Sequence, residues 1–143
     1  MRAPMRHRPG SGGRPGVMFL VKACTMFSAA HRIEGHPRCG KIHGHNYRVC
    51  IVVREERPLQ VDLDALEEWL ERNVFQRFDH QYLNKVLAAP DKDEKLVVTS
   101  EELAVLIADM LEQAFPGRVE YVEVCETENL CIEYRPPRRG GFR

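Results

Sequence analysis

The sequence lacks any long apolar run, and this absence excludes the commonest kind of membrane protein. No stretch of its 143 residues approaches the ~20 apolar residues that a transmembrane helix requires. Residues 1–16, rich in Arg, Pro and Gly, also lack the apolar segment of a secretory signal peptide. We therefore expect a cytoplasmic protein without a membrane partner.

The sequence also lacks an even number of cysteines, which argues against a disulfide framework. An odd count without a signal peptide is typical of a reducing compartment. We expect four of the five to be buried thiols, because they lie in apolar stretches. Cys39 differs, because its neighbours are polar or charged. The five are Cys24, Cys39, Cys50, Cys125 and Cys131.

Net charge is absent, since 21 basic and 21 acidic residues balance, but the two signs are unevenly distributed. Residues 1–16 hold four arginines and no acid, and residues 135–143 hold four more. The rest of the chain has 13 basic against 21 acidic residues, which disfavours a specific nucleic-acid partner. We expect a disordered basic tail at 1–16, one domain at 17–135 and a flexible basic tail at 136–143.

Apolar periodicity predicts four strands and two helices in this domain. Alternation and β-branched residues predict strands over residues 19–27, 47–53, 119–125 and 130–134. Helical spacing predicts helices over 63–78 and from Thr99 to Pro116, each with a capping box: Asp64 with Glu67, and Thr99 with Glu102. This order predicts an α+β fold, a four-stranded antiparallel sheet with both helices on one face.

The main candidate site is His43-Gly44-His45, with His31 upstream. Side chains two residues apart in a strand point to the same face, so His43 and His45 can bind one metal ion. Gly44 lets the backbone bend or approach closely there. With His31 as third ligand, a tetrahedral zinc would keep one open position, as catalytic zinc sites do. His36 competes for that role but lies in an expected loop, and we rank it below His31.

Cys39, four residues before His43, determines whether this metal site is open. As a fourth ligand it would close a structural zinc site. Beside an open site it would be a nucleophile or base, and a buried inert thiol is a third interpretation. Its neighbours Arg38 and Lys41 favour the thiolate, which is the reactive form.

Three further features each have a functional interpretation and a purely structural one. Asp79-His80 follows the first predicted helix and is either an oriented proton-transfer pair or a cap or surface pair. Glu126, at the end of the third strand, is either simply exposed or a ligand for a guanidine-like group. Residues 17–50 hold five basic residues and one acidic residue, which indicates a pocket for a phosphorylated substrate or a solvated basic loop.

Six segments of the sequence occur in an order and approximate spacing typical of one family. They are FSAAHRI, CGKIHGHNYRV, VDLDALE, FDHQYLN, TSEELA and VEVCETEN. Over about residues 18–134 the chain resembles the 6-pyruvoyl-tetrahydropterin synthase / 6-carboxytetrahydropterin synthase family. The resemblance implies a tunnelling fold (T-fold), whose trimers close their sheets into a barrel and stack as hexamers with active sites between subunits.

The resemblance also implies a role for each candidate residue. One zinc ion per subunit would be bound by three histidines, beside a catalytic thiol and a proton-transfer pair that can act across a subunit boundary. A glutamate would anchor the pterin ring, helped by a segment at the start of the second helix. The implied zinc ligands are His31, His43 and His45. The implied catalytic residues are Cys39, Asp79 and His80. The implied substrate-binding residues are Glu126, Thr99, Ser100 and Glu101.

The implied substrate is 7,8-dihydroneopterin triphosphate. The pyruvoyl branch of the family eliminates triphosphate and leaves a diketone side chain. The carboxy branch also cleaves the side chain, releasing acetaldehyde and giving 6-carboxy-5,6,7,8-tetrahydropterin for queuosine-type deazaguanine nucleosides. The short Cys-x-x-x-His-Gly-His motif resembles the carboxy branch, although the loop from His31 to Cys39 is shorter than in most members. The alternatives are a pyruvoyl-forming synthase and a non-catalytic zinc-containing pterin-binding module.

Overall fold

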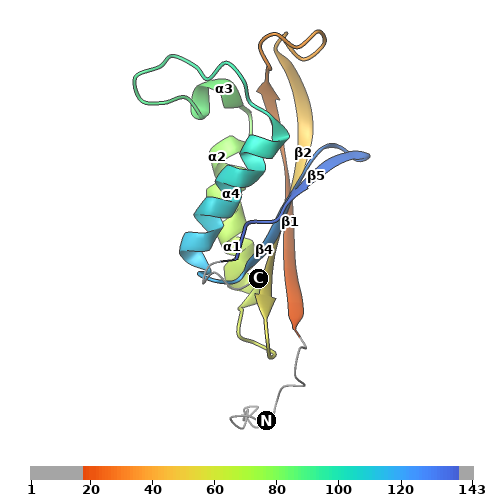
Figure 1. Ribbon diagram of the computed structural model, residues 1–143, viewed down its shortest axis with the longest axis vertical. Coiled ribbons are helices and arrows are strands. Elements are labelled where there is room, and N and C mark those ends of the chain that lie inside the picture. Colours follow the sequence, from red (N-terminus) through yellow and green to blue (C-terminus); the bar gives the residue numbers. More distant parts are fainter. Residues whose placement is uncertain (1–17, 139–143) are drawn as a thin grey trace.

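The computed structural model describes residues 18–138, which form one sheet covered on one face by helices (Figure 1). Neighbouring strands follow the order β3-β1-β2-β4-β5. The strands are β1 (Phe19–His31), β2 (His43–Glu55), β3 (Gln81–Tyr82), β4 (Val119–Thr127) and β5 (Leu130–Tyr134). The helical elements are α1 (Leu63–Leu70), the π-helical η1 (Glu71–Phe75), α2 (Gln76–Phe78), α3 (Leu83–Val86) and α4 (Ser100–Ala114). The tail predicted at 1–16 lies outside the described residues, as do residues 139–143 of the tail predicted at 136–143.

The predicted α+β class is confirmed, and the four predicted strands are all present. The sheet differs from the prediction in having a fifth strand, because β3 pairs in parallel with Ala29 and Ala30 of β1. With only two residues, β3 is too short to show any periodicity in the sequence. Among the described residues, no helix is both long enough and apolar enough to span a membrane.

The β1–β2 hairpin is the longest feature and carries the candidate site at its closed end. Its antiparallel register runs without a shift from the pair Phe19 and Glu55 to the pair His31 and His43. On β1, Phe27, Ala29 and His31 are buried, whereas the residues between them are more exposed. Because side chains alternate between the two faces of a strand, His31 stands on the same face as the core.

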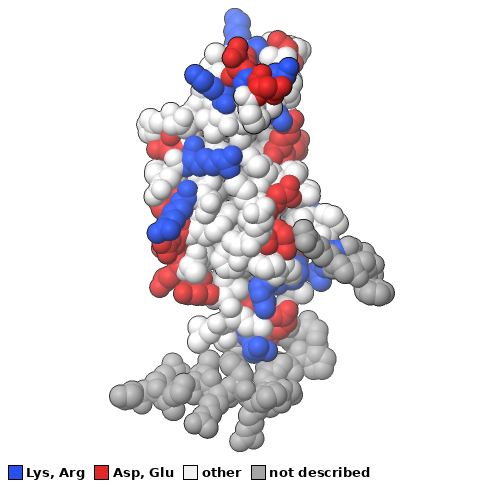
Figure 2. Space-filling view, turned by 90° about the vertical axis from the view of Figure 1, so that its left-hand side faces the viewer, with Lys and Arg blue, Asp and Glu red and all other residues white. Residues whose placement is uncertain are grey.

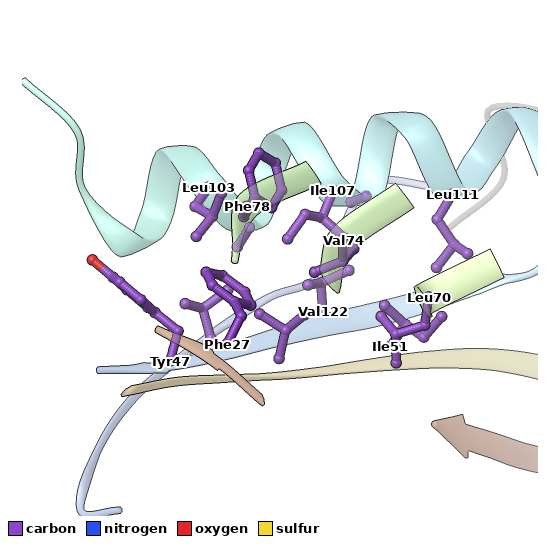
Figure 3. Packing of buried hydrophobic residues seen from close by; sticks show 14 of the residues in the cluster. Phe27, Tyr47, Ile51, Leu70, Val74, Phe78, Leu103, Ile107, Leu111 and Val122 are labelled. Carbon is purple, nitrogen blue, oxygen red and sulfur yellow. The ribbon is translucent and has the colours of Figure 1, made fainter. Parts of the chain in front are cut away.

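Apolar side chains from the helices pack onto this face and form the core (Figure 3). Their spacing of three or four residues along each helix is the pattern on which the helix predictions rested. Leu70, Val74 and Phe78 come from the first helical segment, Leu103, Ile107 and Leu111 from α4, and Phe27, Ile51 and Val122 from the sheet.

One of the two predicted helix caps is confirmed and the other is wrong. The side chain of Thr99 accepts a hydrogen bond from the backbone N–H of Glu102, as expected for the start of α4. The first helix begins instead after Asp62, whose carboxylate accepts from the N–H of Asp64. Asp62 is itself an excellent N-cap residue, so the helix starts two residues earlier than the predicted box.

The prediction that four cysteines are buried thiols is wrong. Cys24 and Cys131 are exposed, while Cys50 and Cys125 are buried. Each exposed cysteine lies directly opposite a buried one on the neighbouring strand. Two disulfides result, Cys24–Cys50 between β1 and β2 and Cys125–Cys131 between β4 and β5. Cross-strand partners are set by register, which an odd cysteine count does not reveal. Cys39 is the free cysteine.

Candidate metal centre and active site

Three imidazoles meet at the closed end of the β1–β2 hairpin. His31 and His43 are directly opposite each other, and His45 lies two residues further along the same face of β2. The ring centroids are between 4.6 and 5.0 Å apart. One ligand atom from each ring lies within 4.8 Å of the other two. The structure thus brings together the three residues that were predicted as zinc ligands.

Hydrogen bonds to backbone carbonyls orient two of the rings. The Nδ1 atom of His31 lies 2.8 Å from the carbonyl oxygen of Val98, and that of His43 lies 2.7 Å from the carbonyl oxygen of Lys41. A carbonyl oxygen only accepts, so each Nδ1–H donates and each Nε2 keeps its lone pair. This is the tautomer in which Nε2 binds a metal ion.

Two of the imidazole nitrogens have no hydrogen-bond partner among residues 18–138. The Nε2 atoms of His31 and His45 are buried and make no hydrogen bond within the described residues. A buried polar atom without a partner is costly, and a metal ion would relieve this cost. Three imidazole donors fit zinc and leave one coordination position open for substrate. The residues therefore fit the implied metal.

Burial keeps two of the rings in the form that binds metal. Burial lowers the pKa of His31, against a smaller raising effect of its hydrogen bond to Val98. Burial also lowers the pKa of His45, although the carboxylate of Glu126 opposes this shift. Both rings are therefore biased toward the neutral state, in which the lone pair is available.

Cys39 lies half-buried in the loop between β1 and β2, outside the group of three histidines. The loop is organised around His36, whose Nδ1 accepts hydrogen bonds from the backbone N–H groups of Cys39 (2.9 Å) and Arg38 (3.2 Å). His36, the competing ligand, is exposed and stabilises the turn. A Cβ at Gly40 would come within 2.7 Å of the carbonyl oxygen of His36, so this turn requires glycine.

Asp79 and His80 form an oriented pair. The backbone N–H of Ser28 donates to Asp79 Oδ1 at 3.0 Å, and Asp79 Oδ2 lies 2.7 Å from Nδ1 of His80. Because a carboxylate accepts, His80 donates through Nδ1 and its Nε2 is free to take a proton. These bonds also lower the pKa of Asp79, chiefly through Ser28. The His80 side chain is 82% exposed and its φ of +59° is unusual for a non-glycine residue.

Glu126 projects from β4 toward the histidines. Its Oε1 accepts a hydrogen bond from the hydroxyl of Ser100 at 2.8 Å, and its Oε2 lies 3.8 Å from His45 Nε2. The other two residues of the predicted binding segment are placed differently. Thr99 caps α4, and Glu101 is exposed on the first turn of that helix.

Two hollows flank His45. The first, of about 480 Å³, is lined by residues that include Ser28, His45 and His80. The second, of about 360 Å³, is lined by residues that include His45, Arg48 and Glu126. His80 and Glu126 therefore border different hollows, whose linings share Gly44, His45 and Asn46.

The basic residues between positions 17 and 50 do not gather in one pocket. Arg32 forms ion pairs with Glu94 at 3.1 Å and Glu34 at 3.4 Å. Arg48 lies 3.6 Å from Glu123 and borders the second hollow. On the helix-covered side of the molecule, acidic side chains lie toward the two edges and at the upper end of the view, with basic side chains among them (Figure 2). Of these basic residues, Arg48 borders a hollow beside the site, as a pocket for a phosphorylated substrate would require.

Tyr47 is a site residue to which sequence reasoning assigned no role. It is 1% exposed, and its ring lies 5.7 Å from that of His31 and 5.4 Å from that of His45. Burial raises its pKa, so the phenol stays protonated. Figure 3 shows its hydroxyl directed away from the rest of the core. The spacing of residues 43, 45 and 47 was the available signal, since alternate positions share a face.

Residues 20–137 match the 6-pyruvoyl tetrahydropterin synthase family. This protein belongs to that family. A putative 6-carboxy-5,6,7,8-tetrahydropterin synthase of Archaeoglobus fulgidus is 32% identical over 82% of this chain and 96% of its own length. Human 6-pyruvoyl tetrahydrobiopterin synthase is also 32% identical, over 87% of this chain and 96% of its own.

The fold is shared with solved members of the family. The 6-pyruvoyl tetrahydropterin synthase of Caenorhabditis elegans superposes with a TM-score of 0.67 at 25% identity, over 85% of this chain and 97% of that one. The T-fold subunit implied by the sequence is thereby confirmed. Family membership establishes a pterin-processing enzyme, and relatives of equal identity carry the names of two different products.

Proposed function

We propose that this protein is a zinc-dependent carbon–carbon lyase of the 6-carboxytetrahydropterin synthase type. It would convert 7,8-dihydroneopterin triphosphate to 6-carboxy-5,6,7,8-tetrahydropterin, releasing acetaldehyde and triphosphate. One observation carries the proposal: three imidazoles converge with two buried, unpartnered Nε2 atoms, while the free thiol of Cys39 stays outside that group. This arrangement supports an open catalytic zinc site and not a closed structural one.

His31, His43 and His45 would hold the zinc, which supplies Lewis-acid polarisation of the substrate's side-chain hydroxyls when bound. Tyr47, buried against two of these rings, keeps water away from one side of the site. Burial also biases His31 and His45 toward the neutral state, in which they can bind metal.

Proton transfer is assigned to Cys39 and to the Asp79–His80 pair. The carboxylate of Asp79 holds the imidazole of His80 with Nε2 free, and this orientation suits a general base. His80 and His45 border the same hollow, so a substrate that reaches the metal site through it also meets the base. Cys39, a half-buried thiol beside the cationic Arg38 and Lys41, would act as the second proton carrier.

Glu126 would bind the amino-pyrimidine edge of the pterin, a planar guanidine-like group that donates two parallel hydrogen bonds. The hydroxyl of Ser100 holds one carboxylate oxygen and thereby orients the group. Thr99 contributes by fixing the start of α4, and Glu101 lies exposed in the first turn of that helix.

The carboxy branch is favoured by the single thiol of the Cys-x-x-x-His-Gly-His motif, which has no glutamate beside it. The Archaeoglobus relative and a Synechocystis relative at 30% identity both carry the carboxy name. Formation of the pyruvoyl product is the second candidate, and the human relative at 32% identity favours it. The carboxy product would place the enzyme in queuosine-type deazaguanine biosynthesis, in the cytoplasm.

The deciding experiment incubates the zinc-loaded protein with dihydroneopterin triphosphate and measures acetaldehyde, pyruvoyl-pterin and triphosphate separately. Acetaldehyde and triphosphate in equal amounts would support the proposal. Triphosphate with pyruvoyl-pterin and no acetaldehyde would assign the other branch. Absence of all three products with zinc fully bound would refute both enzyme assignments and leave a pterin-binding module.

A further inference from the structure

The face of the sheet away from the helices carries the four remaining cysteines in two adjacent cross-strand rows. In one row Cys24 on β1 lies opposite Cys50 on β2. In the next row Cys125 on β4 lies opposite Cys131 on β5. The Cα atoms within the pairs are 4.1 and 3.9 Å apart, close to the spacing at which opposed side chains approach most closely. Both pairs are joined as disulfides.

Each pair consists of one exposed and one buried cysteine. Cys24 and Cys131 are exposed, whereas Cys50 is 0% and Cys125 2% exposed. An external thiol or disulfide can therefore approach only the exposed member. An accessible cysteine with a buried partner that resolves the mixed disulfide is the arrangement of a redox-responsive thiol pair.

One ion pair, between Arg48 and Glu123 at 3.6 Å, places its cation beside Cys24 and its anion near the second cysteine pair. The guanidinium of Arg48 donates to Cys24 Sγ at 3.7 Å. A carboxylate oxygen of Glu123 instead lies within 4.8 Å of the sulfur atoms of Cys125 and Cys131. A nearby cation stabilises a thiolate and a nearby anion destabilises it. Because the thiolate is the species that exchanges, we expect the Cys24–Cys50 pair to exchange with external thiols faster than the Cys125–Cys131 pair.

We propose that Cys24 and Cys50 form a reversible thiol–disulfide couple on the open face of the sheet, reacting with low-molecular-weight thiols and disulfides of the glutathione type through Cys24. In the oxidation, the Cys24 thiolate attacks one sulfur of the small disulfide, which leaves a mixed disulfide and releases one thiol. The Cys50 thiolate then attacks the Cys24 sulfur, closing the cross-strand bond and releasing the second thiol. Two electrons and two protons pass to the small disulfide.

The couple is connected to the pterin site through Arg48. The same side chain that contacts Cys24 also borders the hollow containing His45 and Glu126. Arg48 already pairs with Glu123, and a Cys24 thiolate would add a second anion beside its guanidinium, which would then attract a triphosphate less strongly. Reduction would therefore raise KM for the pterin triphosphate while kcat stays unchanged. This consequence rests on the proposed function, whereas the couple itself does not.

The test begins without any assay of turnover. The full-length protein is equilibrated in mixtures of reduced and oxidised glutathione, the free thiols are alkylated at intervals, and each cysteine is followed by peptide mass spectrometry. We expect Cys24 and Cys50 to appear and disappear together, reversibly, and faster than Cys125 and Cys131. The variant Cys50→Ser should accumulate one glutathione adduct on Cys24. Equal rates for both pairs, or irreversible oxidation, would overturn the proposal.

Matched variants test the assigned electrostatics. Arg48→Gln should slow exchange at Cys24 by about tenfold, as expected for loss of one charge at contact distance. Glu123→Gln should accelerate exchange at Cys131, and at Cys24 as well, because it also releases Arg48 from its ion pair. A zinc ion bound by the reduced pairs and protecting them from oxidation would assign a metal site and refute the couple.

The link to the pterin site is measured separately, as KM in the reduced and oxidised states. Cys125→Ser, which leaves Arg48 and Cys24 intact, is the control and should keep the redox response of KM. A working couple with an unchanged KM would refute the link alone. Absence of turnover in both states would count against the proposed function and leave the couple intact.

Discussion

Single hydrogen bonds set the chemistry of the histidine cluster. The carbonyl of Val98, 67 residues away from His31 in sequence, fixes the ring of that histidine, and the carbonyl of Lys41 fixes His43. Backbone acceptors of this kind raise ligand basicity and hold the ring orientation before metal arrives. No local pattern could have predicted the Val98 contact, because it depends on how the segment before α4 returns to the hairpin.

The zinc content of two variants distinguishes the proposed metal ligands from the proposed catalytic thiol. We expect Cys39→Ala to keep one zinc per subunit but to lose about 100-fold or more in kcat, as is usual when a proton carrier is removed. His43→Ala should lose both zinc and turnover, since two imidazoles hold zinc poorly. Elemental analysis of the purified variants, alongside product formation, provides the measurement. Release of zinc by Cys39→Ala would identify the thiol as a structural ligand and contradict its assigned role.

Asp79 gives a prediction with a defined pH dependence. Its pKa is lowered from 3.8 chiefly by the N–H of Ser28 and then by His80, so its ionised form stabilises the fold. This contribution is present above the ordinary value and is lost as the pH falls through the folded value. Asp79→Asn should therefore unfold at lower temperature than the wild type at pH 7, with a difference that shrinks below about pH 4. A difference that is constant over this range would contradict the assignment.

At the scale of elements, Gly40 in the loop between β1 and β2 and Gly44 in β2 differ in how each would accept a side chain. A Cβ at Gly40 would collide with the backbone of His36, whereas a Cβ at Gly44 would lie 3.6 Å from the carbonyl of Ala29, an ordinary contact. The sequence suggested that Gly44 lets the backbone bend or approach closely, whereas the hairpin keeps a regular register at this position and leaves room for a side chain.

The two glycines form a matched pair of variants. Gly40→Ala should displace the turn that carries Cys39, lowering kcat while zinc stays bound. Gly44→Ala should fold normally and retain zinc, and its methyl group would raise KM, because Gly44 lines both hollows beside His45. Steady-state kinetics with zinc analysis distinguish the two. A Gly40→Ala variant with unchanged kcat would show that the position of Cys39 does not control turnover.

How far the elements could be predicted depends on their length. The long strands and α4 repeat their apolar pattern often enough to be recognised, and the Thr99 cap marks the start of α4. The π-helical turn within the first helical segment and the two-residue β3 leave no such pattern. The pairing of Cys24 with Cys50 depends on strand register, which periodicity alone does not determine.

On the scale of the whole molecule, the edge of β1 that faces away from β2 is paired with β3 only at Ala29 and Ala30. The N–H and C=O of Ser28 both point away from β2, since they bond to Asp79 and His80. Because hydrogen-bonding direction alternates along a strand, the backbone groups of Lys22 also point outward. Beyond the short contact with β3, no described strand pairs with this edge of β1. An unpaired edge of this length normally finds a partner strand.

The trimer implied by the sequence would use this edge, and proline tests it. Lys22→Pro removes one outward N–H while leaving the hydrogen bonds to β2 intact, so the subunit should fold but assemble poorly. Lys22→Ala is the control for loss of the side chain. We expect native mass spectrometry to find trimers or hexamers for the wild type and Lys22→Ala, and mainly monomers for Lys22→Pro. Assembly unaffected by the proline would exclude pairing through this edge, and the complementary edge at β5 would become the next candidate.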